Sequence, residues 1–256
     1  MKVFPSARER RKIDFVICGT QKGGTSALDA YLRDHPLICM ANQKEVHFFD
    51  EEKHFRGSKP DYPAYHACFS PGPSHRLLGE ATPAYMYWYD APRRMWQYNP
   101  GMKLLVVLRN PIDRAYSHWN MQRKRGIDNL SFWDALHSEK ERCRAALPYQ
   151  HKQFSYVDRG FYLEQLRRLS TYFARDQALI MRHEDLRSRP KETMDAICDF
   201  LGVDPVQDLQ VREVHSHEYD SPMSKSEWEH LRFVFEYEIR GLERLLGWDC
   251  SDWLAG

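Results

Sequence analysis

The sequence predicts an α/β protein in which helices cover both faces of a central, mainly parallel sheet. The first indication is an apolar run at residues 15–18 that stops at a glycine and leads through a loop into a helix-compatible stretch. The second is residues 103–108 (KLLVVL), an apolar run without alternation, which is typical of a strand buried on both faces of a parallel sheet. Residues 178–181 are predicted to form another buried strand. Together these runs predict a three-layer α/β/α fold of the P-loop type.

The segment at residues 14–28 (DFVICGTQKGGTSAL) is predicted to form a strand, a tight loop and a helix, an arrangement that binds anions. The first N–H groups of a helix lack internal partners, and its N-terminus carries partial positive charge. Gly23 and Gly24 let the backbone approach a ligand, and Lys22 adds a mobile positive charge. A Walker A loop would have its lysine where this chain has Thr25. An ordinary ATPase or GTPase is therefore disfavoured.

Length and composition narrow the class of protein. The 256 residues suit one domain over 1–256 with an N-terminal tail at 1–12. A net charge of +1 gives no global field for nucleic acid. No apolar run reaches the length of about 18 residues expected of a membrane span, and the N-terminus has no apolar signal segment. The six cysteines are scattered without metal-ligand spacing, so we expect reduced thiols in a cytoplasm and no metal.

Further elements follow from local signals. A helix is expected to end before Pro36, because proline disfavours helical geometry in the preceding residue. Asn110 and Pro111 suit the start of another helix, and Gly202 suits the end of one. The expected helices are 26–33, 62–69, 92–98, 111–124, 131–147, 160–173, 191–201 and 224–246, and short strands are expected at 37–40 and 77–80.

Residues 44–50 (KEVHFFD) interleave polar and apolar side chains, and the pattern leaves two interpretations open. A half-buried strand with a solvated face gives this alternation. Glu45 and His47 would also share one face of such a strand, which is how an acid/base pair can be presented.

Arg109 follows the strand at 103–108, and Ser117 lies two turns into the next helix. Because ligands of open α/β sheets bind beyond the carboxyl ends of the strands, we expect Arg109 and the loop of Lys22 to open on one crevice.

With these motifs in place, the chain resembles the sulfotransferases that use 3′-phosphoadenosine 5′-phosphosulfate (PAPS), from about residue 13 to 248. It looks more like a bacterial member acting in the cytoplasm than like a Golgi enzyme, since it shows no anchor. Residues 15–28 are similar to the 5′-phosphosulfate loop, residues 104–111 with Ser117 to the 3′-phosphate motif, and residues 44–50 with 82–85 (TPAY) to the heparan sulfate sulfotransferase branch.

The resemblance implies a role for each matching residue. Glu45 matches the general base, and His47 and Asp50 match flanking positions that orient the base or contact the acceptor, as Tyr85 is also expected to do. Lys22 would stabilise charge on the leaving phosphate oxygen. The expected donor-binding residues are Lys22, Gly23, Gly24, Thr25 and Ser26 for the phosphosulfate, Arg109 and Ser117 for the 3′-phosphate, and Tyr162 near the adenosine. The expected product is 3′,5′-diphosphoadenosine (PAP).

Sulfuryl transfer depends chiefly on positioning and on stabilising spread charge. A sulfuryl group has one charge fewer than a terminal phosphoryl, so Lys22 and helix dipoles are expected to suffice without Mg²⁺. Two segments depart from the heparan-type pattern. That branch commonly carries Glu-Lys before Thr-Pro-Ala-Tyr, whereas this chain has Glu80-Ala81, so the second cation is absent or supplied from elsewhere. Residues 212–221 occupy the place of a basic loop that closes over the nucleotide.

The acceptor is expected to be a hydroxyl of a carbohydrate, or alternatively of a lipid or small natural-product alcohol. Two other classes compete with this interpretation. A P-loop kinase or hydrolase requires a Walker lysine and an aspartate at a strand end, where this chain has Arg109. The presence of Lys22 together with Glu45 argues against a non-catalytic binder of PAPS, PAP or a glycan. The expected acceptor loops are residues 51–75, 85–98 and 148–158.

Overall fold

The structure is a computed structural model that describes residues 11–57, 59–207, 209, 219 and 221–255. In this part of the chain five parallel strands form one sheet in the order β2-β3-β1-β4-β5. The strands are β1 (Phe15–Gly19), β2 (Ile38–Met40), β3 (Leu77–Ala81), β4 (Lys103–Leu108) and β5 (Ala178–Arg182). The α-helices are α1 (Thr25–Arg33), α2 (Tyr62–His66), α3 (Ala84–Tyr87), α4 (Ala91–Tyr98), α5 (Pro111–Lys124), α6 (Phe132–Ala145), α7 (Tyr162–Tyr172), α8 (His183–Ser188), α9 (Pro190–Leu201), α10 (Lys225–Leu246) and α11 (Ser251–Leu254), and short 3₁₀ turns are η1 (Glu52–His54), η2 (Asp158–Gly160) and η3 (Arg175–Gln177).

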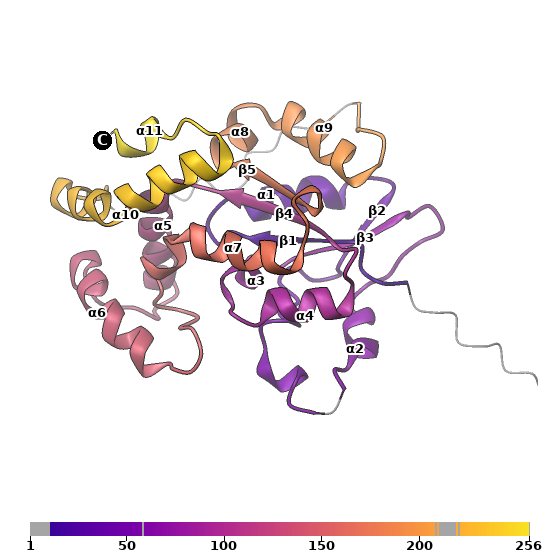
Figure 1. The fold of residues 1–256 in the computed structure, drawn as a ribbon, viewed down its shortest axis with the longest axis horizontal. Helices are drawn as coiled ribbons and strands as arrows, with labels where there is room; N and C mark the ends of the chain where they lie inside the picture. Colours follow the sequence, from indigo (N-terminus) through magenta and orange to yellow (C-terminus); the bar gives the residue numbers. More distant parts are fainter. Residues whose placement is uncertain (1–10, 58, 208, 210–218, 220, 256) are drawn as a thin grey trace, which may run out of the picture.

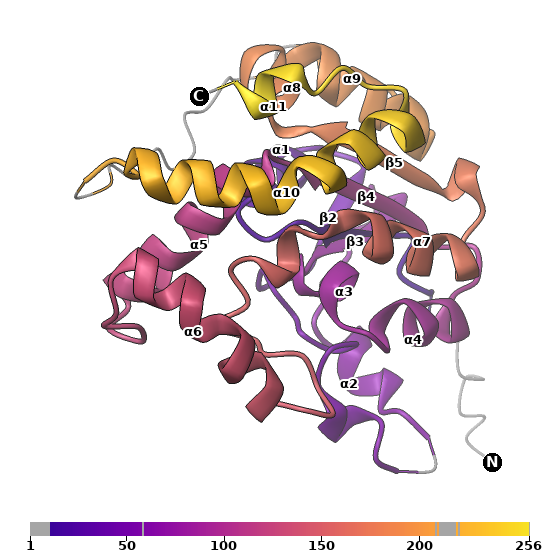
Figure 2. The ribbon, with the colours of Figure 1, turned by 60° about the vertical axis from the view of Figure 1, so that its left-hand side comes forward.

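The side chains of β4 alternate between two apolar clusters, one on each face of the sheet. Leu104 and Val106 pack in the larger cluster, with residues of α3, α4, α5, α7 and α10. Leu105 and Val107 pack in the smaller one, with residues of α1, α8 and α9. Figure 1 shows α8 and α9 on one side of the sheet and α3, α4 and α7 on the other, and the turned view in Figure 2 keeps that separation. The predicted three-layer α/β/α fold is therefore confirmed.

Strand β5 differs from its prediction. It pairs only with β4 and lies at one edge of the sheet, and Met181 is its one buried residue. The expectation of a buried strand is therefore wrong for its other residues, because a strand at the edge of the sheet has a neighbouring strand on one side only. Helices α3, α8 and α11 were not predicted, since each spans only four to six residues and gives little helical periodicity.

Because the strands are parallel, their carboxyl ends meet at one edge of the sheet. β1, β3, β4 and β5 end there in Gly19, Ala81, Leu108 and Arg182. The segments that follow these strands build the candidate active site. Among the described residues, no helix combines the length and apolar character needed to span a membrane. All six cysteines are unpaired.

Candidate active site

The loop after β1 is fastened to the neighbouring strand. The N–H of Thr20 donates to the carbonyl of Val107 at 3.0 Å, and the N–H of Gly23 donates to the carbonyl of Thr20 at 2.8 Å. A Cβ at Gly23 would lie 2.5 Å from the Val107 oxygen. Position 23 therefore requires glycine so that the loop can pack this tightly on β4.

Gly24 connects the loop to α1. Its φ of 96° lies in the left-handed region that glycine tolerates, and no described side chain caps the helix that begins at Thr25. The first turn, with Thr25 buried and Ser26 half-buried, thus presents N–H groups with no partner inside the helix. The imidazole of His183 packs against Gly24 and donates from Nδ1 to the Gly23 carbonyl at 3.1 Å. Sequence reasoning missed His183, although it stands directly after β5.

Lys22 lies among cations. Arg109 donates from Nη1 to the carbonyl of Lys22 at 3.4 Å, so the structure brings together the two residues expected to share a crevice. Burial, together with the nearby charges of Arg109, Arg125 and Lys44, lowers the pKa of Lys22 to about 8. Such a concentration of positive charge attracts anions. Arg125 was not singled out in the sequence, since it stands in a run of basic residues at the end of α5.

Two further residues that were predicted to bind the nucleotide, Ser117 and Tyr162, are buried. Ser117 is buried on α5, whose N-terminus is capped by Asn110 through the N–H of Ile112. Tyr162 is fully buried and donates its hydroxyl to the carbonyl of Arg109 at 3.0 Å. Tyr162 therefore supports the backbone of Arg109, and its ring is not presented to a ligand.

Residues 44–50 do not form the half-buried strand that their alternation allowed. Glu45 and His47 have φ values of 60° and 55°, which a β-strand excludes. The N–H of Glu45 donates to the carbonyl of Ala81 at 2.9 Å, so the segment is a loop at the carboxyl end of β3. Lys22, Glu45 and His47 are the non-glycine residues with positive φ in the described chain. Such strained conformations cluster at functional sites.

Glu45, His47 and Asp50 form a chain of charged contacts. Nδ1 of His47 lies 2.9 Å from Oδ2 of Asp50, and Nε2 lies 3.5 Å from Oε2 of Glu45. Lys44 donates from Nζ to Oε1 of Glu45 at 2.7 Å. The hydrogen bonds to Asp50 and Glu45 raise the pKa of His47 to about 9, and those from His47 and Lys44 lower the pKa of Glu45 to about 2. Near neutral pH Glu45 is a carboxylate and His47 an imidazolium.

Asp50 and Tyr85 lie behind this loop and not at its surface, so the structure does not support direct contact of either with the acceptor. Both side chains are fully buried. Asp50 is held by His47 and lies 3.3 Å from Nζ of Lys152. The hydroxyl of Tyr85 accepts the N–H of Phe48 at 2.9 Å. Both residues therefore position the loop that carries Glu45.

Glu80 is the buried anchor of this arrangement, and sequence reasoning gave it no role. Its carboxylate accepts hydroxyl groups from Tyr65 at 2.5 Å, Thr82 at 2.7 Å and Tyr85 at 3.1 Å. Burial raises its pKa to about 7. Two of its partners, Thr82 and Tyr85, in turn accept N–H groups of the loop, at His47 and Phe48.

Positive charge reaches the loop from two lysines. Ala81 is buried in the apolar cluster of α1 and contributes no charge. Lys44 contacts Glu45 at one end of the loop, and Lys152, from the segment before η2, contacts Asp50 at the other. The expected closing loop at 212–221 falls outside the described residues, apart from 219 and 221. In the described part of the chain, no group of three or more His, Cys, Asp or Glu side chains is arranged to hold a metal ion.

Known proteins share this fold and these motifs. A family model described as "Sulfotransferase domain" matches residues 12–232. The human bifunctional heparan sulfate N-deacetylase/N-sulfotransferase 2 is 30% identical over 202 residues, which cover 75% of this chain and 22% of that protein. The human heparan sulfate glucosamine 3-O-sulfotransferase 6 is 32% identical over 200 residues, which cover 76% of this chain and 53% of that protein. The chain thus spans about a fifth of the first relative and about half of the second.

The crystal structure of a sulfotransferase from Alicyclobacillus acidocaldarius matches with a TM-score of 0.81 and 30% identity, covering 95% of this chain and 99% of that one. The resemblance found in the sequence, including its lean toward heparan sulfate enzymes, is confirmed by these matches. The chain belongs to the sulfotransferase family.

Proposed function

We propose that this protein transfers the sulfuryl group of PAPS to a hydroxyl of a carbohydrate, with Glu45 as general base. The observation that carries the proposal is the pairing of two loops at one sheet edge. One holds Lys22 at the start of α1, and the other holds Glu45 at the end of β3. The charge of Glu45 acts on Lys22, where it raises the pKa against the lowering by burial and the neighbouring cations, which supports a shared site for the two groups.

The residues at this edge suit the donor. The uncapped start of α1 presents free N–H groups, and glycine at position 23 lets the loop before it pack closely on β4. We assign Lys22, Gly23, Gly24, Thr25 and Ser26 to the phosphosulfate. PAPS, when bound, would supply the activated sulfuryl group.

Arg109 and Ser117 are assigned to the 3′-phosphate, where the planar fork of an arginine binds two oxygens at once. Tyr162 holds the Arg109 carbonyl and so fixes where β4 ends. Selection of this nucleotide over one without a 3′-phosphate therefore rests on Arg109.

Glu45 suits the role of base better than His47 does. At neutral pH the carboxylate of Glu45 is unprotonated and can accept a proton, whereas the imidazolium of His47 is protonated on both ring nitrogens and cannot. His47 donates to Glu45 and is itself held by Asp50, so it orients the base. The acceptor proton would pass to a carboxylate oxygen of Glu45. Lys44, which now pairs with that carboxylate, holds its basicity low until anionic ligands compete for the ammonium.

The carbohydrate acceptor is proposed from the relatives, which are named for heparan sulfate. A panel of oligosaccharides, phenols and fatty alcohols with sulfur-labelled PAPS tests it. We expect label in the oligosaccharides and stoichiometric release of PAP. Label in a lipid alcohol alone would leave the chemistry intact and replace the acceptor, while PAP binding without transfer to any acceptor would favour a non-catalytic binder.

A further inference from the structure

One cavity lies next to a lysine that contacts the loop of Glu45. It measures about 370 Å³ and lies between the segment after α3 and the turn that follows α6. His151 lines it, and the next residue, Lys152, reaches the buried carboxylate of Asp50 at 3.3 Å. The ammonium of Lys152 also lies 5.0 Å from the ring centre of Trp88, between the cavity walls and the catalytic loop. The cavity is thus linked through Lys152 to the loop that carries Glu45.

The walls of this cavity are joined by specific contacts. The side-chain amide of Gln150 accepts the N–H of Tyr89 at 3.1 Å and donates to the carbonyl of Tyr87 at 2.9 Å. The rings of Trp88 and Tyr149 stack at 5.9 Å with an interplanar angle of 15°. These contacts fix two segments that lie some sixty residues apart in the chain. The cavity is therefore formed before any ligand enters.

Its lining offers an open aromatic surface. Tyr89 is 66% exposed and Tyr149 is 42% exposed. The guanidinium of Arg168 lies behind the ring of Tyr89, 5.2 Å from its centre, and holds that ring in place. Rings presented in this way accept the flat, apolar face of another ring at small entropic cost.

Polar groups in the cavity are of two kinds. The guanidinium of Arg144 makes no hydrogen bond or ion pair with any described residue, so an unneutralised cation faces the cavity. Nδ1 of His151 accepts the N–H groups of Gln153 and Phe154, each at 3.1 Å, which leaves Nε2 as a donor. A ligand that pairs with Arg144 and with Nε2 of His151 must carry an anionic group and a hydrogen-bond acceptor next to a ring face.

We propose that this cavity binds an acidic saccharide unit of the acceptor, at a distance from the hydroxyl that receives the sulfuryl group. Tyr89 and Tyr149 pack on the sugar ring, Arg144 pairs with its carboxylate or sulfate, and Nε2 of His151 donates to a hydroxyl oxygen. This assignment rests on the proposed function, because it takes the acceptor to be a carbohydrate. An acyl chain or a plain phenol would leave Arg144 without a counter-charge.

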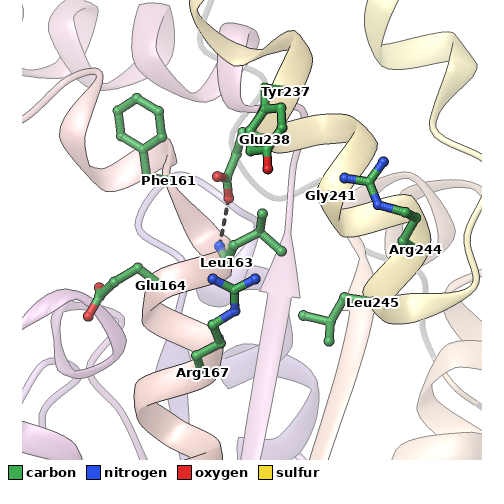
Figure 3. A pocket seen from close by; sticks show the side chains of 9 residues that line it. All are labelled: Phe161, Leu163, Glu164, Arg167, Tyr237, Glu238, Gly241, Arg244 and Leu245. Atoms are coloured by element: carbon green, nitrogen blue, oxygen red, sulfur yellow. Dashed lines mark hydrogen bonds between the residues drawn. The ribbon is translucent and has the colours of Figure 1, made fainter.

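A matched control lies on the far side of α7. A larger cavity of about 470 Å³ between α7 and α10 also has an exposed tyrosine, Tyr237, and an arginine, Arg244, as Figure 3 shows. It is lined by residues of α7 and α10 and by Phe161, and it shares no lining residue with the 370 Å³ cavity. Variants there change the same side-chain types without touching the proposed subsite.

The test measures binding of a uronic acid-containing octasaccharide, and of its carboxyl-reduced form, to PAP-saturated protein by calorimetry. Arg144→Gln is expected to weaken binding of the acidic form about tenfold, the worth of one charged hydrogen bond. It should leave the reduced form and PAP binding unchanged. Tyr89→Ala should weaken both forms, and Tyr89→Phe should restore them.

The control variants Arg244→Gln and Tyr237→Ala should bind like the unmodified protein. Equal losses for Arg144→Gln and Arg244→Gln, or equal losses for the acidic and reduced saccharides, would overturn the proposal. If the protein sulfates saccharides and Arg144→Gln leaves the KM for them unaltered, the subsite is overturned. The proposed function is sustained in that case. Saccharide binding without sulfation of any acceptor would instead defeat the proposed function and keep the subsite.

Discussion

The hydroxyl of Tyr85 accepts the backbone N–H of Phe48 at 2.9 Å and donates to the buried carboxylate of Glu80 at 3.1 Å. This contact ties the loop of Glu45 to β3 and α3. Tyr85→Phe leaves the buried N–H without its partner, at a cost of about 1–3 kcal/mol. We expect a lower midpoint of thermal unfolding and a lower kcat, with PAP affinity unchanged. Tyr237→Phe, on an exposed ring, is the control, and an equal effect from both changes would argue against a positioning role for Tyr85.

Removing the proposed base should affect turnover alone. Glu45→Gln keeps the shape of the side chain but cannot take a proton, so kcat should fall by roughly 10² to 10⁴-fold. The dissociation constant of PAP, measured by calorimetry, should change little, because Glu45 lies outside the glycine loop. Retained turnover would remove Glu45 from the mechanism and leave His47 as the group to examine.

Arg109 should distinguish nucleotides by their 3′-phosphate. Arg109→Ala is expected to weaken PAP far more than it weakens adenosine 5′-phosphate, because only PAP loses a partner. Arg93→Ala, which breaks an exposed ion pair with Asp90, provides the control for a change of net charge. Comparable losses for the two nucleotides would show that Arg109 does not contact the 3′-phosphate.

The pH dependence of donor binding should follow Lys22. Its pKa is lowered to about 8, so the ammonium loses its proton as the pH rises through that value. PAP affinity should therefore fall between about pH 7 and 9, and binding should take up protons in that range. Lys22→Arg keeps its charge throughout and should flatten this dependence. His47→Gln must be measured in parallel, since His47 titrates near 9. A slope that survives Lys22→Arg would assign the titration to another group.

Much of the fold could be predicted from the sequence because its strongest signals are local. The apolar run at 15–18 is followed by a glycine-containing loop, and the run at 103–108 is followed by Arg109, Asn110 and Pro111. Helix α8 could not be predicted, because its six residues give little helical periodicity. The position of β5 at the edge of the sheet could not be predicted either, because a few apolar residues look alike in a core strand and an edge strand.

The sequence indicated the charged residues of the candidate site. It did not indicate the residues that hold its loops in position. Lys22, Glu45 and Arg109 stand out by motif. Glu80 does not, because its role depends on three hydroxyl groups that the chain brings together only after folding. His183 likewise gains its contact with the glycine loop from a residue 160 positions earlier. The alternation of residues 44–50 suggested a strand because periodicity does not report the sign of φ.

The left-handed backbone conformation of Glu45 and His47 lowers the stability of the fold at two positions that are proposed to act in catalysis. A side chain held in that conformation costs about 1–2 kcal/mol per residue, which glycine avoids. Selection for heat tolerance alone would thus favour glycine at positions 45 and 47. Glycine there would relieve backbone strain but would remove the carboxylate of Glu45 and the imidazole of His47. Programmes that engineer this enzyme for longer service at high temperature should hold both positions constant and look for gains on α10 or at the open edge of β5.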